Sequence, residues 1–442
     1  MRILKQFQDI KNKGIKELIK KSKIVLIFTI NYPFYIISII IAAPFVILIR
    51  LIKPLIHIRF RTISTGQLGH FVADAGILLC ESIINKNNDK AKDWYWLSQG
   101  IGMGYQAQNW YLLEPRACNN QLRKMIRRTF FVHWWVKYLF ITNNIIPGGK
   151  HHTAEAPRQV QGSRDTSGLL YKTKELSEAY FKFSTKENSE AKKFLKEIGL
   201  EEKDKFVCLC VRDVSYRKYI SPYQNFDYHN FRNSDIKTYS LAAAELAERG
   251  YWVFRMGKKV LKPFDCTHPK VIDYAYSEKK SDLLDIWLMA HCSFCISTGM
   301  GIDLVAEHYR RPILFVNFLP VGDTNSFASS LTYFKHLQWN ANNKKLNMKE
   351  CLENNTYFAT ELKKNNIDVI DLTEEEIKEA ALEIEERFSG VWKDNDEDIK
   401  LQEKFWSTLK EWNKFSKYHN FINPKAKMST SFLRTNSNWL SK

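Results

Sequence analysis

Apolar and polar positions alternate along residues 206–372 in a way that predicts buried strands separated by helices. The predicted strands are FVCLCVRD, YWVFRMG, KVIDYAY, SFCIST, PILFVN and NIDVIDL. Helical patterns occupy residues 235–249, 281–290 and 302–309, and a capping box that begins at Thr373 opens a further helix. Strands that alternate with helices at this spacing indicate a parallel sheet covered on both faces, so we expect a doubly wound α/β domain.

The first half of the chain carries a weaker version of the same pattern. A strand over 57–65 is followed by a turn at 66–70, an apolar helix over 71–84 and a strand-like run over 93–99. Residues 147–168 are rich in helix breakers, and a charged helix over 186–198 leads into the second domain. The predicted organisation is therefore a segment 1–57, a domain 58–185, a domain 186–390 and a helical or polar tail 391–442.

A long apolar segment near the N-terminus predicts membrane attachment. Residues 24–49 contain no charged side chain, which exceeds the roughly 20 residues needed to span a bilayer. The first 63 residues hold twelve Lys or Arg and two acidic residues, in a chain with net charge +18. Basic flanks of an apolar segment suit anionic lipid headgroups better than nucleic acid. A buried core helix is the alternative, whereas a cleaved signal peptide would start nearer the terminus and end in small residues.

The topology of this segment has two readings. The N-terminal flank is the more basic, so a spanning helix would place the rest of the chain outside. Pro33, Pro44 and Pro54 favour a helical hairpin that enters and leaves one leaflet. We expect the hairpin, with the protein on the cytoplasmic face of the inner membrane. A second, aromatic-rich stretch over 127–146 predicts either a headgroup-level segment or a buried helix.

The eight cysteines and the acidic run DNDED do not indicate a metal site. Most cysteines lie in apolar runs, and the Cys292-x-x-Cys295 pair has no second pair at zinc spacing, which favours a reducing compartment. DNDED, at 394–398, contains an Asp-x-Asp that could hold a divalent ion. Because it follows a glutamate-rich helix in a run of like charge, we interpret it as a solvated acidic link.

Polar residues follow four of the predicted strands and suggest a phosphate site. The carboxyl ends of parallel strands share one edge of the sheet, where ligands bind. Glycines let the backbone approach an anion, helix N-termini favour it, and an Arg fork binds two oxygens at once. The candidate ligand-binding residues are Arg212, Arg255, Gly257, Ser297, Thr298, Gly299 and Gly301, with Asn317 secondary. Asp282 and Asp285 are weaker candidates, since carboxylates are favoured in a first helical turn anyway.

A second turn offers a candidate general base. His70 closes the Gly66–Gly69 turn at the start of a helix, and an imidazole titrates near neutral pH. Asp74 lies four residues on, which places it on the same helical face. It could orient the imidazole or act as the base itself. A polar histidine at a helix start, with no chemistry, is the alternative.

Several of these residues carry a resemblance to a known family. Residues 160–320, with the motifs Arg232-Asn-Ser-Asp235-Ile, Arg255-Met-Gly257, Asp273-Tyr-Ala and Ser281-Asp-Leu-Leu-Asp285, resemble bacterial glycosyltransferases of surface-polysaccharide gene clusters. The resemblance adds Arg232 to the donor-binding candidates. More distantly, Ser-Thr-Gly-x-Gly is similar to the donor loop of heptosyltransferases. In this chain Ser297 stands where that loop has an Asp, and Asp303 lies near the position where the loop has a His.

The resemblance implies a GT-B fold of two Rossmann-like domains, with the acceptor on 58–185 and a nucleotide sugar on 186–390. It also implies transfer of a hexosyl or heptosyl group to a lipid-linked or surface-polysaccharide acceptor, as in lipopolysaccharide synthesis, with no metal or cofactor. The alternatives are a pyruvyl- or phospho-transferase of the same pathway and a non-catalytic membrane scaffold with a relict nucleotide pocket.

Overall fold

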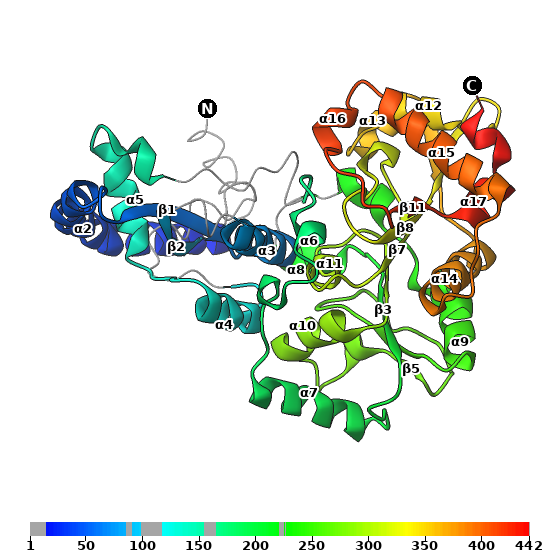
Figure 1. Cartoon of the computed structure of the whole chain (residues 1–442), viewed down its shortest axis with the longest axis horizontal. Helices are drawn as coiled ribbons and strands as arrows, with labels where there is room; N and C mark the ends of the chain where they lie inside the picture. Colours follow the sequence, from blue (N-terminus) through cyan, green and yellow to red (C-terminus); the bar gives the residue numbers. More distant parts are fainter. Residues whose placement is uncertain are drawn as a thin grey trace. The chain divides into compact units, whose positions relative to one another are not determined.

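The computed structural model describes residues 15–84, 91–98, 117–153, 165–220, 225 and 227–441. The chain forms two compact units (Figure 1). Unit 1 comprises 1–66, 86–118 and 126–156, and unit 2 comprises 67–85, 119–125 and 157–442. The helix after the first strand, which the sequence places in a 58–185 domain, thus clusters with unit 2. The acceptor domain over 58–185 stays a prediction.

Unit 2 is built on a seven-stranded sheet in which all neighbouring strands are parallel. The strand order is β11-β8-β7-β6-β3-β4-β5. From β3 onward this corresponds to the 3-2-1-4-5-6 order of a Rossmann sheet, so the predicted doubly wound α/β fold is confirmed. The strands are β3 Phe206–Cys210, β4 Trp252–Arg255, β5 Val271–Ile272, β6 Cys295–Ser297, β7 Ile313–Phe318, β8 Ser330–Phe334 and β11 Lys427–Met428.

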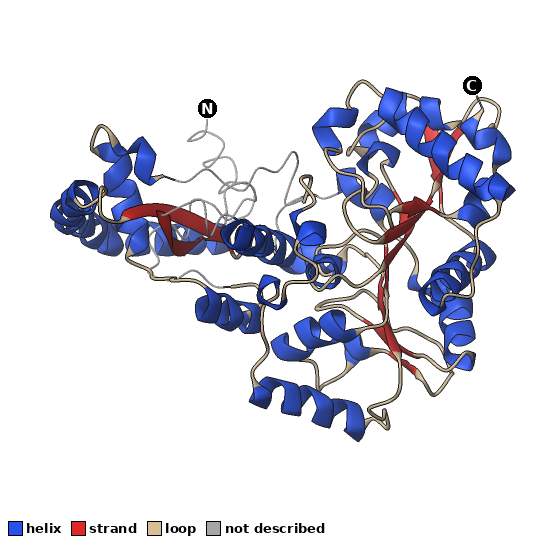
Figure 2. Cartoon of the chain, viewed as in Figure 1, coloured by secondary structure: helices blue, strands red, loops and turns tan. Residues whose placement is uncertain are grey.

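Helices cover both faces of this sheet, which Figure 2 shows edge-on. In Figure 1, α7 and α10 lie on one side of the sheet, and α9 and α14 pack together on the other. The helices of unit 2 are α3 Leu68–Ile84, α6 Leu169–Lys172, α7 Thr185–Glu197, α8 Ser215–Ile220, α9 Ser240–Glu248, α10 Asp282–His291, α11 Asp303–His308, α12 Met348–Glu353, α13 Ala359–Lys364, α14 Glu374–Ser389, α15 Asp396–Glu411, α16 Phe415–Tyr418 and α17 Thr430–Thr435. The capping box predicted at Thr373 is present.

Two predicted strands differ in the structure. KVIDYAY forms only the two-residue strand β5, because Tyr274 begins a 3-10 turn. NIDVIDL forms β10, Ile367–Ile370, which pairs antiparallel with β9, His336–Trp339, in a separate two-stranded sheet. Strands β8 and β11 were not expected from the sequence. The last of these comes from the tail, so the tail is part of the core sheet.

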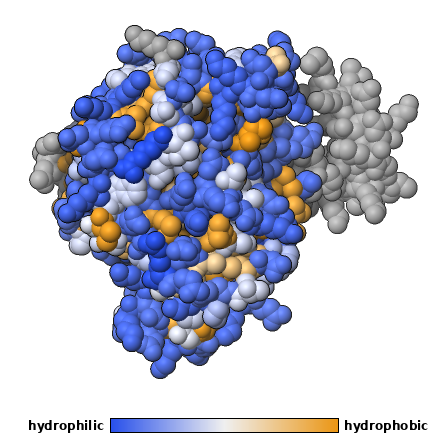
Figure 3. Space-filling view, turned by 90° about the vertical axis from the view of Figure 1, so that its right-hand side faces the viewer, coloured by the Kyte–Doolittle hydropathy of each residue, from blue (hydrophilic) through white to orange (hydrophobic). Residues whose placement is uncertain are grey.

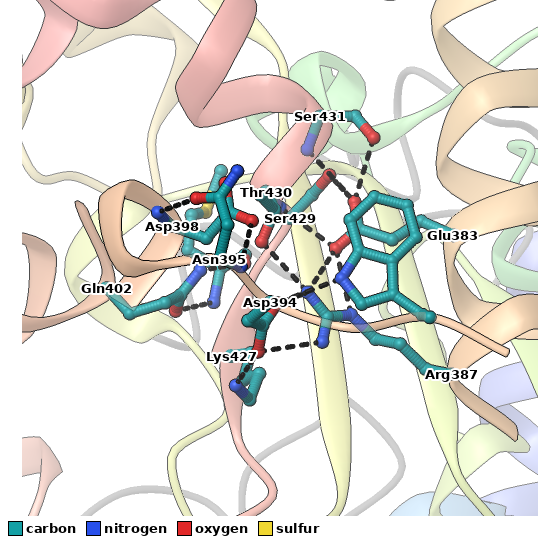
Figure 4. Close-up of polar contacts among 12 residues, drawn as sticks. Glu383, Arg387, Asp394, Asn395, Asp398, Gln402, Lys427, Ser429, Thr430 and Ser431 are labelled. Carbon is teal, nitrogen blue, oxygen red and sulfur yellow. Dashed lines mark hydrogen bonds and ion pairs between the residues drawn. The ribbon is translucent and has the colours of Figure 1, made fainter. Parts of the chain in front are cut away.

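A buried carboxylate joins the tail to the rest of unit 2 (Figure 4). Glu383 on α14 is 1% exposed. Its oxygens accept hydrogen bonds from Ser429 Oγ (2.6 Å), Thr430 N (3.0 Å), Ser431 N and Oγ (both 3.0 Å) and Arg387 Nε (2.9 Å). The start of α17 is therefore fixed to α14 by one acidic side chain.

The acidic run at 394–398 is structural rather than a solvated link. Asp394 accepts Arg387 Nη2 at 2.7 Å and Lys427 Nζ at 2.5 Å, and Figure 4 shows the two basic side chains meeting there. Asp398 is 1% exposed and pairs with Arg434 at 2.7 Å. The interpretation of DNDED as a solvated link was wrong, because basic residues distant in the sequence form ion pairs with two of its aspartates.

Unit 1 contains α2 Ile15–Leu51, β1 His57–Ser64, β2 Ala91–Ser98 and α5 Val136–Ile145; α4, Asn120–Thr129, runs across the boundary between the units. Strands β1 and β2 pair in parallel. Ala42, Val46 and Ile49 of α2 share a core with β1 and α5. Residues 136–145 of the aromatic stretch thus form a partly buried helix, whereas Phe131 and Trp134 are 56% and 36% exposed.

The predicted helical hairpin is wrong, because α2 is one continuous helix of 37 residues that contains Pro33 and Pro44. Within the described ranges, Tyr32–Leu51 is the one stretch with the length and hydropathy of a membrane span, with a mean hydropathy of 2.5. A signal sequence or a core helix would pass the same test of length and composition. Membrane association therefore stays a prediction at this point.

Candidate functional site

The predicted site lies where the strand order of the unit 2 sheet reverses. Strands β3 and β6 are neighbours, and the chain leaves them in opposite directions, to β4 on one side and β7 on the other. In doubly wound sheets, ligands bind outside the carboxyl ends of the strands at this switch point. Arg212 follows β3 here, and the segment Thr298–Gly301 follows β6.

The structure brings Arg212, Arg232, Thr298 and Gly299 together. Arg212 donates its backbone N–H to Thr298 Oγ1 at 2.9 Å. Arg232 donates from Nη2 to the carbonyl oxygen of Gly299 at 2.9 Å. Gly299 has φ +76°, and a Cβ there would lie 2.9 Å from the Phe318 ring, so the loop requires glycine at this position. Two predicted donor-binding arginines thus flank one predicted loop.

The loop itself is held mainly by its own side chains. Ser297 Oγ donates to Asp303 Oδ2 at 2.6 Å, and the N–H groups of Gly299 and Met300 donate to Ser297 Oγ and Asp303 Oδ2 at 3.1 and 2.6 Å. Burial raises the pKa of Asp303 to about 6. Because two backbone N–H groups already have acceptors inside the loop, the arginine side chains are the better anion-binding groups.

Two groups that were not expected from the sequence lie beside these arginines: Arg217, which adds a third positive charge, and the imidazole of His229. Burial, with the charges of Arg232 and Arg217, lowers the pKa of Arg212 to about 8. Burial and the same three arginines lower the pKa of His229 to about 4. Such shifts show that positive charge is unfavourable here. Arg212 forms no ion pair with any described residue, so a bound anion would offset the unfavourable positive charge of its guanidinium.

A cavity of about 320 Å³ lies beside the cluster at the carboxyl ends of β3 and β4. Arg212 Nε donates to Asn233 Oδ1 at 3.3 Å, and Asn233 is one of the residues that line the cavity. The other lining residues include Val211, Asp213, Ser234, Ile236, Leu261, Lys262, Asp371 and Arg255, the predicted donor-binding residue at the end of β4. Apolar side chains and hydrogen-bonding groups are both available to a ligand there.

Asn317 contributes to the position of this segment. Its side chain is buried, donates from Nδ2 to Ser234 Oγ at 3.0 Å, and accepts the N–H of Leu372 at 2.8 Å. The predicted secondary candidate thus ties the end of β7 to the turn that follows Arg232. It holds the turn rather than facing an open site.

Other predicted donor residues are engaged in packing. A Cβ at Gly257 would lie 2.6 Å from Val260 Cγ1. Asp282 accepts the N–H of Asn120 at 2.8 Å and pairs with Lys258 at 3.1 Å. Asp285 accepts the Tyr274 hydroxyl at 3.0 Å, and burial raises its pKa to about 6. Their role in binding a donor stays a prediction.

Arg255 is the most deeply buried of the predicted arginines, at 1% exposure, and its Nη1 lies 3.1 Å from Asp273 Oδ1. We expect Arg255→Ala to destabilise unit 2 by about 2–3 kcal/mol, because it leaves the Asp273 carboxylate without its charged partner. Chemical denaturation of the variant measures this, with Arg249→Ala, at a more exposed ion pair, as the control. A stable Arg255→Ala protein would contradict a structural role.

The predicted base lies close to the loop. Gly69, next to His70, contacts Gly301 so closely that a Cβ on Gly69 would lie 2.9 Å from the Gly301 Cα. The first turn of α3, which holds His70, therefore packs on the same loop that contacts Arg212 and Arg232, and Asp74 lies one turn further along the helix. Whether either group acts as a base stays a prediction.

We expect Gly69→Ala to destabilise unit 2 by about 1–3 kcal/mol, since the added methyl forces two backbone segments apart. Thermal unfolding measures the change. Ser82→Ala, at an exposed position of the same helix, is the control and should be close to neutral. An unchanged midpoint for Gly69→Ala would show that α3 and the loop can separate without cost.

Neither a protein-family model nor a curated protein sequence matches the chain. Its structure is similar to glycosyltransferase family 9 heptosyltransferases of the GT-B type. A family 9 glycosyltransferase from Veillonella parvula has 12% identity and a TM-score of 0.36 over 63% of this chain and 86% of its own. The ADP-heptose LPS heptosyltransferase II of E. coli has 10% identity and a TM-score of 0.35 over 74% of this chain and 99% of its own.

An iron-containing dodecameric glycosyltransferase from enterotoxigenic E. coli has 15% identity and a TM-score of 0.25, over 60% of this chain and 59% of its own. These similarities concern the fold alone.

Proposed function

We propose that this chain is a membrane-associated glycosyltransferase of GT-B architecture that moves a sugar from a nucleotide diphosphate to a lipid-linked or surface-polysaccharide acceptor. The observation that carries the proposal is the cluster of Arg212, Arg217 and Arg232 at the switch point of a Rossmann sheet. A diphosphate has the charge and the oxygen geometry that such guanidinium groups bind. The adjoining cavity would receive the nucleoside.

The proposed chemistry assigns a role to each group. His70 or Asp74 removes the proton of an acceptor hydroxyl, whose oxygen attacks the anomeric carbon of the donor sugar. The bond from that carbon to the β-phosphate oxygen breaks, and its electron pair remains on the diphosphate. Arg212 and Arg232 neutralise the charge that develops there, which is the role of preorganised cations in group transfer. Ser297 and Asp303 hold the loop between them.

A panel of nucleotide sugars tests the proposal. The full chain in detergent is incubated with each donor, with and without lipid-linked saccharide, and the released nucleotide and the sugar product are quantified. Sugar transfer or donor hydrolysis with one nucleotide supports the proposal. Transfer of phosphate or enolpyruvate would favour the alternative enzyme, and tight binding without turnover would favour the scaffold.

His229 offers a test of anion binding that does not depend on turnover. Pyrophosphate next to the arginines favours the protonated imidazole, so we expect the pKa of His229 to rise from about 4 by at least about 1 unit. Because the bound state then takes up a proton, binding should tighten as pH falls between the two pKa values.

Histidine NMR titration with and without pyrophosphate measures this shift. His291, whose pKa is lowered by burial at its own site, is the internal control and should not move. A His229 signal that is insensitive to pyrophosphate would place the anion elsewhere.

A further inference from the structure

Over Tyr32–Leu51, helix α2 carries apolar side chains on all sides, although only one side of this stretch is packed. Its buried positions Ser38, Ala42, Val46 and Ile49 recur every three or four residues and form one stripe. The remaining face is exposed and contains Tyr32, Phe34, Ile36, Ile37, Ile40, Ile41, Phe45, Ile47, Leu48 and Leu51. A continuous apolar face of this length is far larger than a monomeric soluble protein normally exposes.

Arg50 fixes this helix to unit 1. Its Nη2 donates to the carbonyl oxygens of Asn143 and Ile146, both at 2.8 Å, and its Nη1 donates to that of Pro147 at 2.7 Å. These carbonyls lie at and beyond the C-terminal end of α5, where helical carbonyls have no partner within the helix. Since α2 also contributes to the core of unit 1, its removal as a signal sequence would open that core.

The neighbours of α2 disfavour a spanning arrangement. The stripe of α2 packs in one core with Ile58 and Phe60 of β1. The same strand carries Arg59 and Arg61, which pair with Asp93 of β2 at 2.7 and 3.0 Å. A helix that crossed the bilayer with this packing would bring those charges and the sheet edges to membrane depth, where they are unfavourable.

Charge and aromatic residues point to lipid as the partner of the exposed face. Lys16, Lys20, Lys21 and Lys23 belong to the first turns of the same helix. Clustered lysines beside an apolar helix attract anionic headgroups. Phe34 and Trp134 both contact Tyr138, and each is more than one-third exposed, as aromatic residues at a lipid–water boundary are. By contrast, the face of the molecule in Figure 3 is mostly hydrophilic, with small scattered apolar groups.

We propose that unit 1 is a monotopic membrane-binding module, in which α2 lies along the plane of an anionic bilayer surface. Its stripe packs on α5 and β1, its opposite face enters the acyl chains, and Arg50 locks the helix to the protein. The attachment does not depend on sugar transfer, and it is measured without a donor, so its failure would leave the proposed enzyme activity untouched.

Flotation tests the lipid contact. The full chain, exchanged from detergent into vesicles of phosphatidylcholine and phosphatidylglycerol, is expected to float with them. The variant Ile40→Asp with Ile47→Asp, at positions 65% and 50% exposed, should lose at least about tenfold in vesicle-bound fraction. Val391→Asp, 69% exposed on unit 2, should float like the wild type. Undiminished flotation of the double variant would overturn the proposal.

Depth measurements distinguish a helix in the membrane plane from one that spans. Single nitroxides are placed at positions 36, 40, 47 and 51, in a chain whose partly exposed Cys118 and Cys266 are changed to serine. These four positions lie within about 60° of one another around the helix axis, so they share one face. The proposal expects equal shallow depths. A gradient of about 22 Å from 36 to 51 would show a spanning helix, and self-association without vesicle binding would show a second copy as the partner; either result would overturn the proposal.

Discussion

Replacing Arg212 by alanine is expected to lower sugar transfer by about 100- to 1000-fold, with a loss of donor affinity. The reason is that Arg212 is anchored through Thr298 at the switch point, and its guanidinium forms no ion pair with a described residue. The substitution should leave thermal stability unchanged or raise it, because it removes a partly buried positive charge from the neighbourhood of Arg217 and Arg232.

Two further variants define what Arg212 supplies. Arg212→Lys keeps the charge but not the two-pronged donor, so partial activity is expected. Arg249 lies at the end of α9, three residues before β4 begins, and therefore near the amino end of that strand; Arg249→Ala should transfer at the wild-type rate. If Arg212→Ala and the wild type had equal activity at subsaturating donor, the arginine cluster would have no role in the reaction.

Replacing Glu383 by alanine is expected to destabilise unit 2 by about 3–5 kcal/mol. The change leaves the Arg387 guanidinium and the N–H groups of Thr430 and Ser431 without their acceptor in a buried setting. Denaturant unfolding followed by tryptophan fluorescence measures the loss. Because the start of α17 is held there, the variant should also expose the tail to limited proteolysis at lower denaturant.

Glu386 provides the matched control for this prediction. It lies on the same helix, is about one-third exposed, and pairs with Arg249 at 3.6 Å. Glu386→Ala should cost about 0.5 kcal/mol or less, as exposed ion pairs do. If the two variants unfolded at the same denaturant concentration, the buried network around Glu383 would have no special role in stability.

The Rossmann core of unit 2 could be predicted because its strands are buried on both faces and read as short apolar runs. Strands Phe206–Cys210 and Ile313–Phe318 are buried throughout, and nearly every residue in them is apolar. Lys427–Met428 could not be predicted, since a two-residue strand exists only through its pairing with Leu331 and Thr332. Long-range pairing leaves no local signal.

The site was predictable to the extent that it follows strands. Arg212 and Thr298 come within two residues of the ends of β3 and β6, so topology alone brings them together. Arg217 and His229 lie in a polar segment with no periodicity, and nothing local relates them to that edge. The sequence also did not show that Asp273 holds Arg255, because the partners of a charged residue depend on packing.

The contact between Gly69 and Gly301 links the two halves of the proposed chemistry. A side chain at either glycine would push the first turn of α3 away from the loop that contacts the arginines. The proposed base and the proposed leaving-group site are therefore held together by one close backbone contact, and we expect a shift of either one to move the other. Changes in sugar preference are then expected to arise away from this contact, among the residues that line the cavity beside Asn233.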